Sequence, residues 1–298
     1  MRRKRLRCPS CGSESVVKKG WNRRDYIEKQ VHLCKECGRR FVENPGNRHP
    51  GKLIMEALNL YSTGDTMEEV KMALRSRYRT RISKSTIHRW VERYSHLAPM
   101  LDHRGSFGPD SLSYQTMELD GERFRFSVNH YKLSLLDPPA PVVLFLDDIL
   151  SMDIEGSFSS LHETEVRVEE EVCDPENDLC RIASLNRGSS KLIRESHWIL
   201  ERFALINDGA TLCCDLPLIY GPVSGGRYPL RADMVRYEKG RICLVDYIRS
   251  TLAGSSLARL ALSAEAFAEE TGLPLSSLRC GYFDEGSYRE FDPTDVIN

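Results

Sequence analysis

Apolar residues recur at helical spacing in three segments of the first hundred residues. Residues 52–62 carry one apolar stripe, and a second helix is expected to begin after Asp65 or Thr66. A third helix should begin after Ser83, with a core face formed by Ile87, Trp90, Val91 and Tyr94. The pattern therefore predicts a three-helix unit over residues 50–98.

The later segments include both strand-like stretches, in which every second residue is apolar, and helix-like stretches, in which apolar residues recur every three or four positions. Residues 114–136 alternate with period two and predict strands, with a turn at Asp120-Gly121, while residues 142–151 are expected to form a short buried helix or strand. After residue 189 the pattern predicts a helix, three strands, a helix and two strands, at residues 190–207, 211–220, 229–238, 241–248, 256–271, 278–283 and 287–291. A turn at Lys239-Gly240 should join the second and third of these strands, and we expect a multidomain α+β protein.

Four cysteines near the start of the chain have the spacing of a metal site. The pairs Cys8/Cys11 and Cys34/Cys37 are separated by 22 residues. Four thiolates so arranged suit one tetrahedral zinc ion, about 2.3 Å from each sulfur. Disulfides are the alternative, but no apolar export signal follows Met1, so we expect a cytoplasmic protein with reduced cysteines and no membrane segment. Residues 1–45 are thus predicted to be a zinc ribbon that needs its metal to fold.

The formal net charge of −1 conceals a division of the chain. Residues 1–104 carry 24 Lys and Arg against 11 Asp and Glu, whereas the remainder carries 18 against 32. A basic module of this size attracts a polyanion, and the favoured partner is double-stranded DNA. A basic surface that is merely solvated remains the alternative.

The third predicted helix has the layout of a recognition helix. Its polar face carries Lys84, Ser85, His88, Arg89 and Arg93, and Arg39 and Arg40 add basic side chains in the ribbon. We name these seven residues as candidate DNA contacts. Residues 82–91 resemble the helix-turn-helix that follows a zinc ribbon in many transposases and resolvases.

The acidic half contains strings that resemble RecB-like PD-(D/E)XK nucleases, namely residues 203–208, 270–274 and 280–285. The resemblance implies a core with the order αβββαβ and a Mg²⁺- or Mn²⁺-dependent DNA endonuclease. It implies Asp233 and Asp246 as metal ligands, the Tyr247 carbonyl as a third, and Glu201 or Glu195 as a further ligand. Asp233, Asp246 and Glu201 are then the candidate catalytic residues. The two aspartates should lie within about 5 Å of each other, close enough to share a cation.

These motifs and the turn-rich stretches between them divide the chain into five parts. They are a zinc ribbon at 1–45, a helix-turn-helix at 50–98, a linker at 99–112, a β-rich accessory lobe at 113–180 and the nuclease-like core at 181–298.

One position departs from the nuclease pattern. The family's lysine stands two residues after the acid of the third strand, where this chain has Ile248. An isoleucine can neither orient the attacking water nor stabilise charge on the phosphate. A displaced cation such as Arg249, Arg259 or Lys191 is one solution, and a fold that has lost its chemistry is the other.

Two other classes of function stay open. A transposase of the DDE type would need three converging carboxylates. The first would come from residues 117–122, which contain Glu118, Asp120 and Glu122, and the others from Asp147 or Asp148 and from Glu195 or Glu201. A DNA-binding transcription regulator would need no active site. The sequence leaves open whether the protein forms a homodimer.

Overall fold

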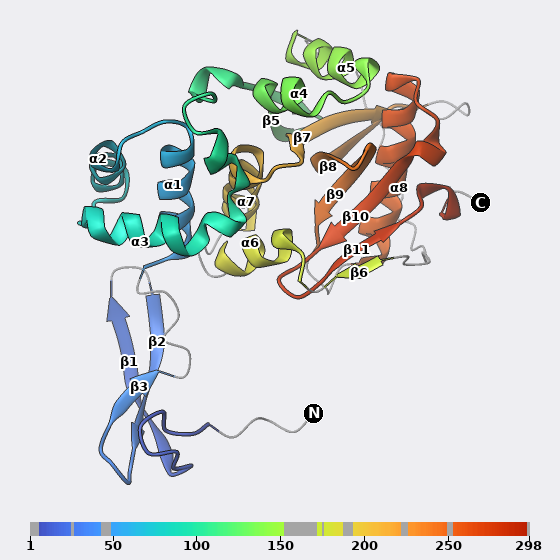
Figure 1. Ribbon diagram of the computed structural model, residues 1–298. Helices are drawn as coiled ribbons and strands as arrows, with labels where there is room; N and C mark the ends of the chain where they lie inside the picture. Colours follow the sequence, from blue (N-terminus) through green and yellow to red (C-terminus); the bar gives the residue numbers. More distant parts are fainter. Residues whose placement is uncertain are drawn as a thin grey trace.

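The computed structural model describes residues 6–24, 27–42, 49–151, 172–174, 176–186, 193–221, 226–248 and 253–296. These residues form a small three-stranded sheet, a three-helix unit and a mixed eight-stranded sheet with helices on both faces (Figure 1). No helix in these ranges is both long and apolar enough to cross a bilayer.

The small sheet contains the cysteine-rich segment. Its antiparallel strands are β1 (Val16–Arg24), β2 (Ile27–Cys34) and β3 (Arg40–Val42). A bulge interrupts the pairing of β1 with β2 between Lys18 and Trp21. The cysteine pairs lie before β1 and in the turn between β2 and β3, so the sheet brings them to the same end.

The three-helix unit consists of α1 (Gly51–Ser62), α2 (Met67–Tyr78) and α3 (Lys84–Tyr94). Thr66 and Glu69 form a capping box at the start of α2, and Ser83 caps α3 by accepting a hydrogen bond from the backbone N–H of Thr86. Ile87, Trp90 and Tyr94 of α3 are buried, as their spacing predicted. The periodicity thus located all three helices and the start of two of them.

The large sheet has the strand order β4-β5-β7-β8-β9-β10-β11-β6. Its strands are β4 (Leu112–Leu119), β5 (Glu122–Asn129), β6 (Val172–Asp174), β7 (Thr211–Tyr220), β8 (Tyr228–Glu238), β9 (Arg241–Tyr247), β10 (Leu278–Phe283) and β11 (Tyr288–Phe291). Among the described strands, β9 and β10 pair in parallel and the other neighbours are antiparallel. The turns at Asp120-Gly121 and Lys239-Gly240 have positive φ at both residues, as two-residue hairpins require.

Helices cover both faces of this sheet. They are α4 (His130–Leu136), α5 (Ala140–Ser151), α6 (Asp178–Asn186), α7 (Ile193–Asn207) and α8 (Ala253–Thr271). On one face, α7 lies between the sheet and the three-helix unit (Figure 1). The apolar side chains of these three parts form one continuous core. On the other face, α5 and α8 pack together through Phe145 and Phe267.

Two segments differ from the sequence-based expectation, and in a third the structure decides between two alternatives. The accessory lobe expected at 113–180 contributes both edges of the large sheet, because β5 pairs with β7 and β6 pairs with β11. The linker expected at 99–112 contains two short 3₁₀ turns, and Met100 in the first turn and Phe107 between the turns are buried. The segment 142–151, left open between helix and strand, is helical.

Residues 130–136 were expected as a strand but form helix α4. The side chain of Asn129 caps this helix by accepting a hydrogen bond from the Lys132 backbone N–H at 3.1 Å. Lys132 is fully buried, and its ammonium group donates hydrogen bonds to the carbonyls of Ala204, Asp208 and Thr211. A helix places this side chain under the end of α7, which is the tertiary contact that overrides the local alternation.

Buried polar contacts fix α1 to α7. Asn207 donates a hydrogen bond to Asn59 at 2.6 Å and accepts one from Ser62 at 2.6 Å, and all three side chains are buried. Glu56 of α1 pairs with Arg202 of α7 at 2.5 Å. Because buried polar groups need specific partners, these contacts fix the orientation of the three-helix unit relative to α7.

Candidate metal centres and nucleic-acid interface

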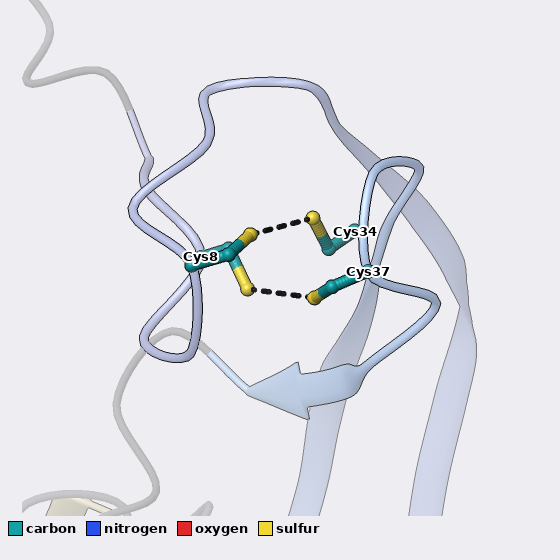
Figure 2. Close-up of side chains that lie close together, drawn as sticks. Cys8, Cys34 and Cys37 are labelled. Carbon is teal, nitrogen blue, oxygen red and sulfur yellow. Dashed lines mark hydrogen bonds between the residues drawn. The ribbon is translucent and has the colours of Figure 1, made fainter.

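The four cysteines of the small sheet form one compact group (Figure 2). All four sulfur atoms lie within 4.8 Å of one another, with 3.6 Å between Cys8 and Cys37 and 3.5 Å between Cys11 and Cys34. These separations are too long for disulfide bonds, and they are close to the ~3.8 Å between sulfurs around a tetrahedral zinc ion. The residues therefore fit zinc, and the prediction of a four-cysteine site is supported.

The backbone supports both cysteine pairs in the same way. The N–H of Gly12 donates to the Cys8 carbonyl at 2.9 Å, and the N–H of Gly38 donates to the Cys34 carbonyl at 3.0 Å. Both glycines have positive φ, which other residues rarely adopt. Two equivalent Cys-x-x-Cys-Gly turns thus present their sulfurs to a common centre.

A second group of possible ligands lies at the junction of α7 with β8. One ligand atom each from His197, Glu201 and Asp233 lies within 4.8 Å of the other two. His197 and Glu201 are four residues apart on α7 and so share one face of the helix. The group lines a pocket of about 640 Å³ whose other walls include Arg123, Arg125, Glu195, Trp198, Asp215 and Arg231.

The guanidinium of Arg231 lies against the carboxylates of this pocket. Its Nη2 is 3.1 Å from Glu201, and its Nε is 3.0 Å from Asp215 and 3.4 Å from Asp233. Although Nε and the Asp215 Oδ1 are close, both are buried and neither forms a hydrogen bond of acceptable geometry. Buried polar atoms without hydrogen bonds are rare in proteins, and a bound water or ion is one way in which they are satisfied.

Asp246 is a neighbour of Asp233 but is not part of the three-residue group. Its Oδ1 accepts a hydrogen bond from the Asp233 backbone N–H at 2.9 Å, while Asp233 accepts one from the Tyr247 N–H at 2.9 Å. Side chains two positions apart on a strand point to the same face of the sheet. The residues two positions before and after Asp246, Leu244 and Ile248, pack on the α8 side. His197, rather than Asp246, therefore completes the group around Asp233, and metal ligation by Asp246 or the Tyr247 carbonyl stays a prediction.

Acidic side chains outnumber arginines in the lining of this pocket. Burial, and then the charge of Asp233, raise the pKa of Glu201 well above its usual value and that of Asp246 to about 8. Burial also raises the pKa of Asp215, although Arg231 opposes the shift. Buried carboxylates with raised pKa values gain most from an added cation, because it stabilises their ionised form.

Of the three cations that the sequence suggested in place of the missing lysine, only Arg259 lies within the described residues. Ile248 is buried with Leu257 and Leu260. Arg259 is an exposed residue of α8, and Lys191 and Arg249 lie outside the described residues. Within the described ranges, Arg231 is an arginine that contacts three carboxylates of the pocket, those of Glu201, Asp215 and Asp233.

The candidate DNA contacts are on the surface. The side chains of Arg39 and Arg40 and of Lys84, Ser85, His88, Arg89 and Arg93 are all exposed. Lys84 pairs with Glu68 at 2.7 Å, and His88 pairs with Glu92 at 3.3 Å. Arg89 donates from Nε to the Ser85 carbonyl at 3.1 Å, which extends its side chain along the helix.

The carboxylates proposed for a DDE-type site are dispersed. Asp120 occupies the hairpin turn between β4 and β5, and Asp147 and Asp148 are exposed on α5. His130 lies 3.9 Å from Asp147. Among the described residues, none of these three aspartates belongs to either group that could hold a metal ion.

Sequence reasoning named Glu195, Glu201 and Asp233, but it missed the rim residues Arg123, Arg125 and Trp198 and three residues that lie among the carboxylates. The last three are His197, Asp215 and Arg231. The spacing of His197 and Glu201 on a predicted helix, and of Arg231 and Asp233 on a predicted strand, was the available signal. Comparison of this chain with protein-family models, curated proteins and solved structures found no match.

Proposed function

We propose that this chain is a zinc-containing DNA-binding protein whose large-sheet domain hydrolyses DNA phosphodiester bonds with a divalent metal ion. The proposal rests mainly on the group of His197, Glu201 and Asp233, whose ligand atoms lie within 4.8 Å of one another in an open pocket. The element order from α7 to β10 agrees with the αβββαβ order of PD-(D/E)XK nucleases and supports this assignment.

The ligand set would suit Mn²⁺ better than Mg²⁺, because it includes an imidazole nitrogen and Mg²⁺ strongly prefers oxygen. A bound ion of this kind supplies a polarised phosphate and an activated water. Arg231 would provide the permanent positive charge that Ile248 cannot, by contacting a phosphate oxygen beside the carboxylates. Glu201 and Asp215 hold that guanidinium in place.

A second candidate is a DNA-binding protein that does not cleave. Two observations favour it: Ile248 occupies the position of the family's lysine, and Arg231 already pairs with three carboxylates, where it could act as a substitute for a metal ion. In that case the pocket would be a remnant of nuclease ancestry and the protein would act as a recognition factor.

Cleavage assays separate these candidates. Wild-type protein incubated with supercoiled plasmid and Mn²⁺ should nick it, and Asp233→Asn should lower the rate at least about a hundredfold. Asp147→Asn, on the exposed side of α5, is the matched control and should cleave like wild type. If Asp147→Asn were the inactive variant, the DDE alternative would be preferred. If wild type bound DNA but nicked none with either metal, the second candidate would replace the first.

Duplex binding should depend on α3. Replacing Arg89 and Arg93 by alanine should weaken binding to mixed-sequence duplex DNA, because each arginine that contacts a phosphate releases counterions. The slope of log affinity against log salt should fall by about 1 for each residue removed. Arg75→Ala, an exposed arginine of α2, is the control and should leave the slope unchanged. An unaltered slope in the double variant would exclude α3 as the DNA-contacting helix.

A further inference from the structure

Aromatic and basic side chains gather at the rim of the carboxylate pocket. Trp198 lines this pocket and is 38% exposed, next to His197 on α7. Few large apolar side chains are exposed in the described part of the chain, so an exposed tryptophan in the lining of this pocket calls for an explanation.

Two arginines hold the Trp198 ring. The guanidinium carbon of Arg125 lies 5.5 Å from the ring centroid and that of Arg202 lies 5.7 Å away. Arg202 is anchored by Glu56, whereas Arg125 is on the exposed face of β5 beside Arg123, and both of these β5 arginines line the pocket. The ring is therefore held in place, while the cations on the β5 side remain at the surface.

This combination has a specific use in nucleic-acid binding. Aromatic rings stack on the faces of nucleobases, and arginines beside them hold the neighbouring phosphates. Bases inside a duplex already stack on one another, so their faces are accessible only in unpaired nucleotides. We propose that Trp198 stacks an unpaired DNA base at the mouth of the carboxylate pocket, with Arg123 and Arg125 on the adjacent phosphates.

The inference rests on the proposed function and makes it more specific: the pocket would accept a single-stranded or frayed DNA segment, while the three-helix unit contacts duplex DNA. A base on Trp198 would bring the next phosphate toward Glu201, three residues later on the same helix. The exposed acids of the rim, Glu122 and Glu195, would repel a strand that entered from other directions.

The test uses full-length protein in buffer without added divalent metal, so that binding is measured apart from cleavage. Fluorescence anisotropy follows a labelled twelve-nucleotide oligothymidine and, separately, a blunt hairpin duplex. Trp198→Ala should weaken binding of the single strand about 5- to 150-fold and leave hairpin binding unchanged. Trp198→Phe, which keeps an aromatic face, should retain most of the affinity. Trp21→Ala removes another exposed tryptophan, in the ribbon, and is the matched control.

The outcomes are distinct. The inference is overturned if wild type fails to bind oligothymidine, if Trp198→Ala binds it like wild type, or if strand and hairpin affinity fall equally. Tighter binding of an oligouridine strand would overturn the assignment to DNA. A 5-iodouracil strand should photocrosslink to Trp198, which checks the contact even if Trp198→Ala folds poorly. Stacking without any plasmid nicking would refute only the proposed hydrolysis, and nicking without stacking would refute only this inference.

Discussion

Replacing Cys34 by serine is expected to unfold the ribbon segment while the rest of the molecule stays folded. Among the ribbon side chains that the structure describes, only Cys8, His32 and Cys34 are buried, so there is no apolar core to hold the sheet. Zinc binding to such sites supplies roughly 10–16 kcal/mol, and this free energy is also the folding free energy. Loss of one thiolate removes most of it.

The measurement is metal content together with backbone amide spectra. Wild type should contain one zinc per chain, and Cys34→Ser or prolonged chelation should remove it and collapse the ribbon resonances. Cys180→Ala is the control, because Cys180 is buried in α6 away from the four-cysteine group. Retention of a full zinc equivalent and a dispersed ribbon spectrum by Cys34→Ser would refute the four-cysteine assignment.

The second large effect is expected at Lys132. Lys132→Met should destabilise the protein by about 3–5 kcal/mol, because it leaves the carbonyls of Ala204, Asp208 and Thr211 buried without their donor. Urea unfolding at pH 7 measures this difference. Lys239→Met, at the exposed tip of the β8–β9 hairpin, is the matched control and should change the free energy of unfolding little. A loss below about 1 kcal/mol for Lys132→Met would show that these contacts contribute little.

The same residue gives stability a specific pH dependence. Burial lowers the pKa of Lys132 to about 8, although Asp208 opposes the shift. Between pH 8 and the unfolded value near 10.4, the unfolded chain binds more protons than the folded one, so stability rises with pH by up to about 3 kcal/mol. The cost of burying the charge is fully present below pH 8. Wild type should show this rise relative to Lys132→Met, and parallel pH profiles would contradict it.

The sequence was sufficient to predict those elements that depend on residue spacing, helix caps and turn residues. The helices of the three-helix unit followed from the spacing of residues such as Ile87 and Trp90 and from the cap at Ser83. The hairpin turns at Asp120-Gly121 and Lys239-Gly240 followed from residues that tolerate positive φ. The cysteine site followed from spacing alone, since two Cys-x-x-Cys turns need little else to meet.

The sequence was insufficient where tertiary packing decides. Helix α4 could not be distinguished from a strand, because the carbonyls that bind Lys132 belong to residues more than seventy positions later. The pocket residues Asp215 and Arg231 come from different strands, and only the register of β7 with β8 places them together. The sequence also could not show that β4 and β5 extend the large sheet, since strand pairing between distant segments leaves no local signal.

The polar contacts between α1 and α7 would fix the distance between the DNA sequence that is bound and the position at which the DNA is cleaved. Asn59 and Ser62 on one helix and Asn207 on the other hold two modules that would otherwise move independently on DNA. If a flexible linker joined the DNA-binding helices to the carboxylate pocket, cleavage would occur at variable distances from the bound sequence. With α3 and the carboxylates of α7 in one rigid frame, breaks would instead fall a constant number of base pairs from the bound sequence, so the protein would act as a molecular ruler.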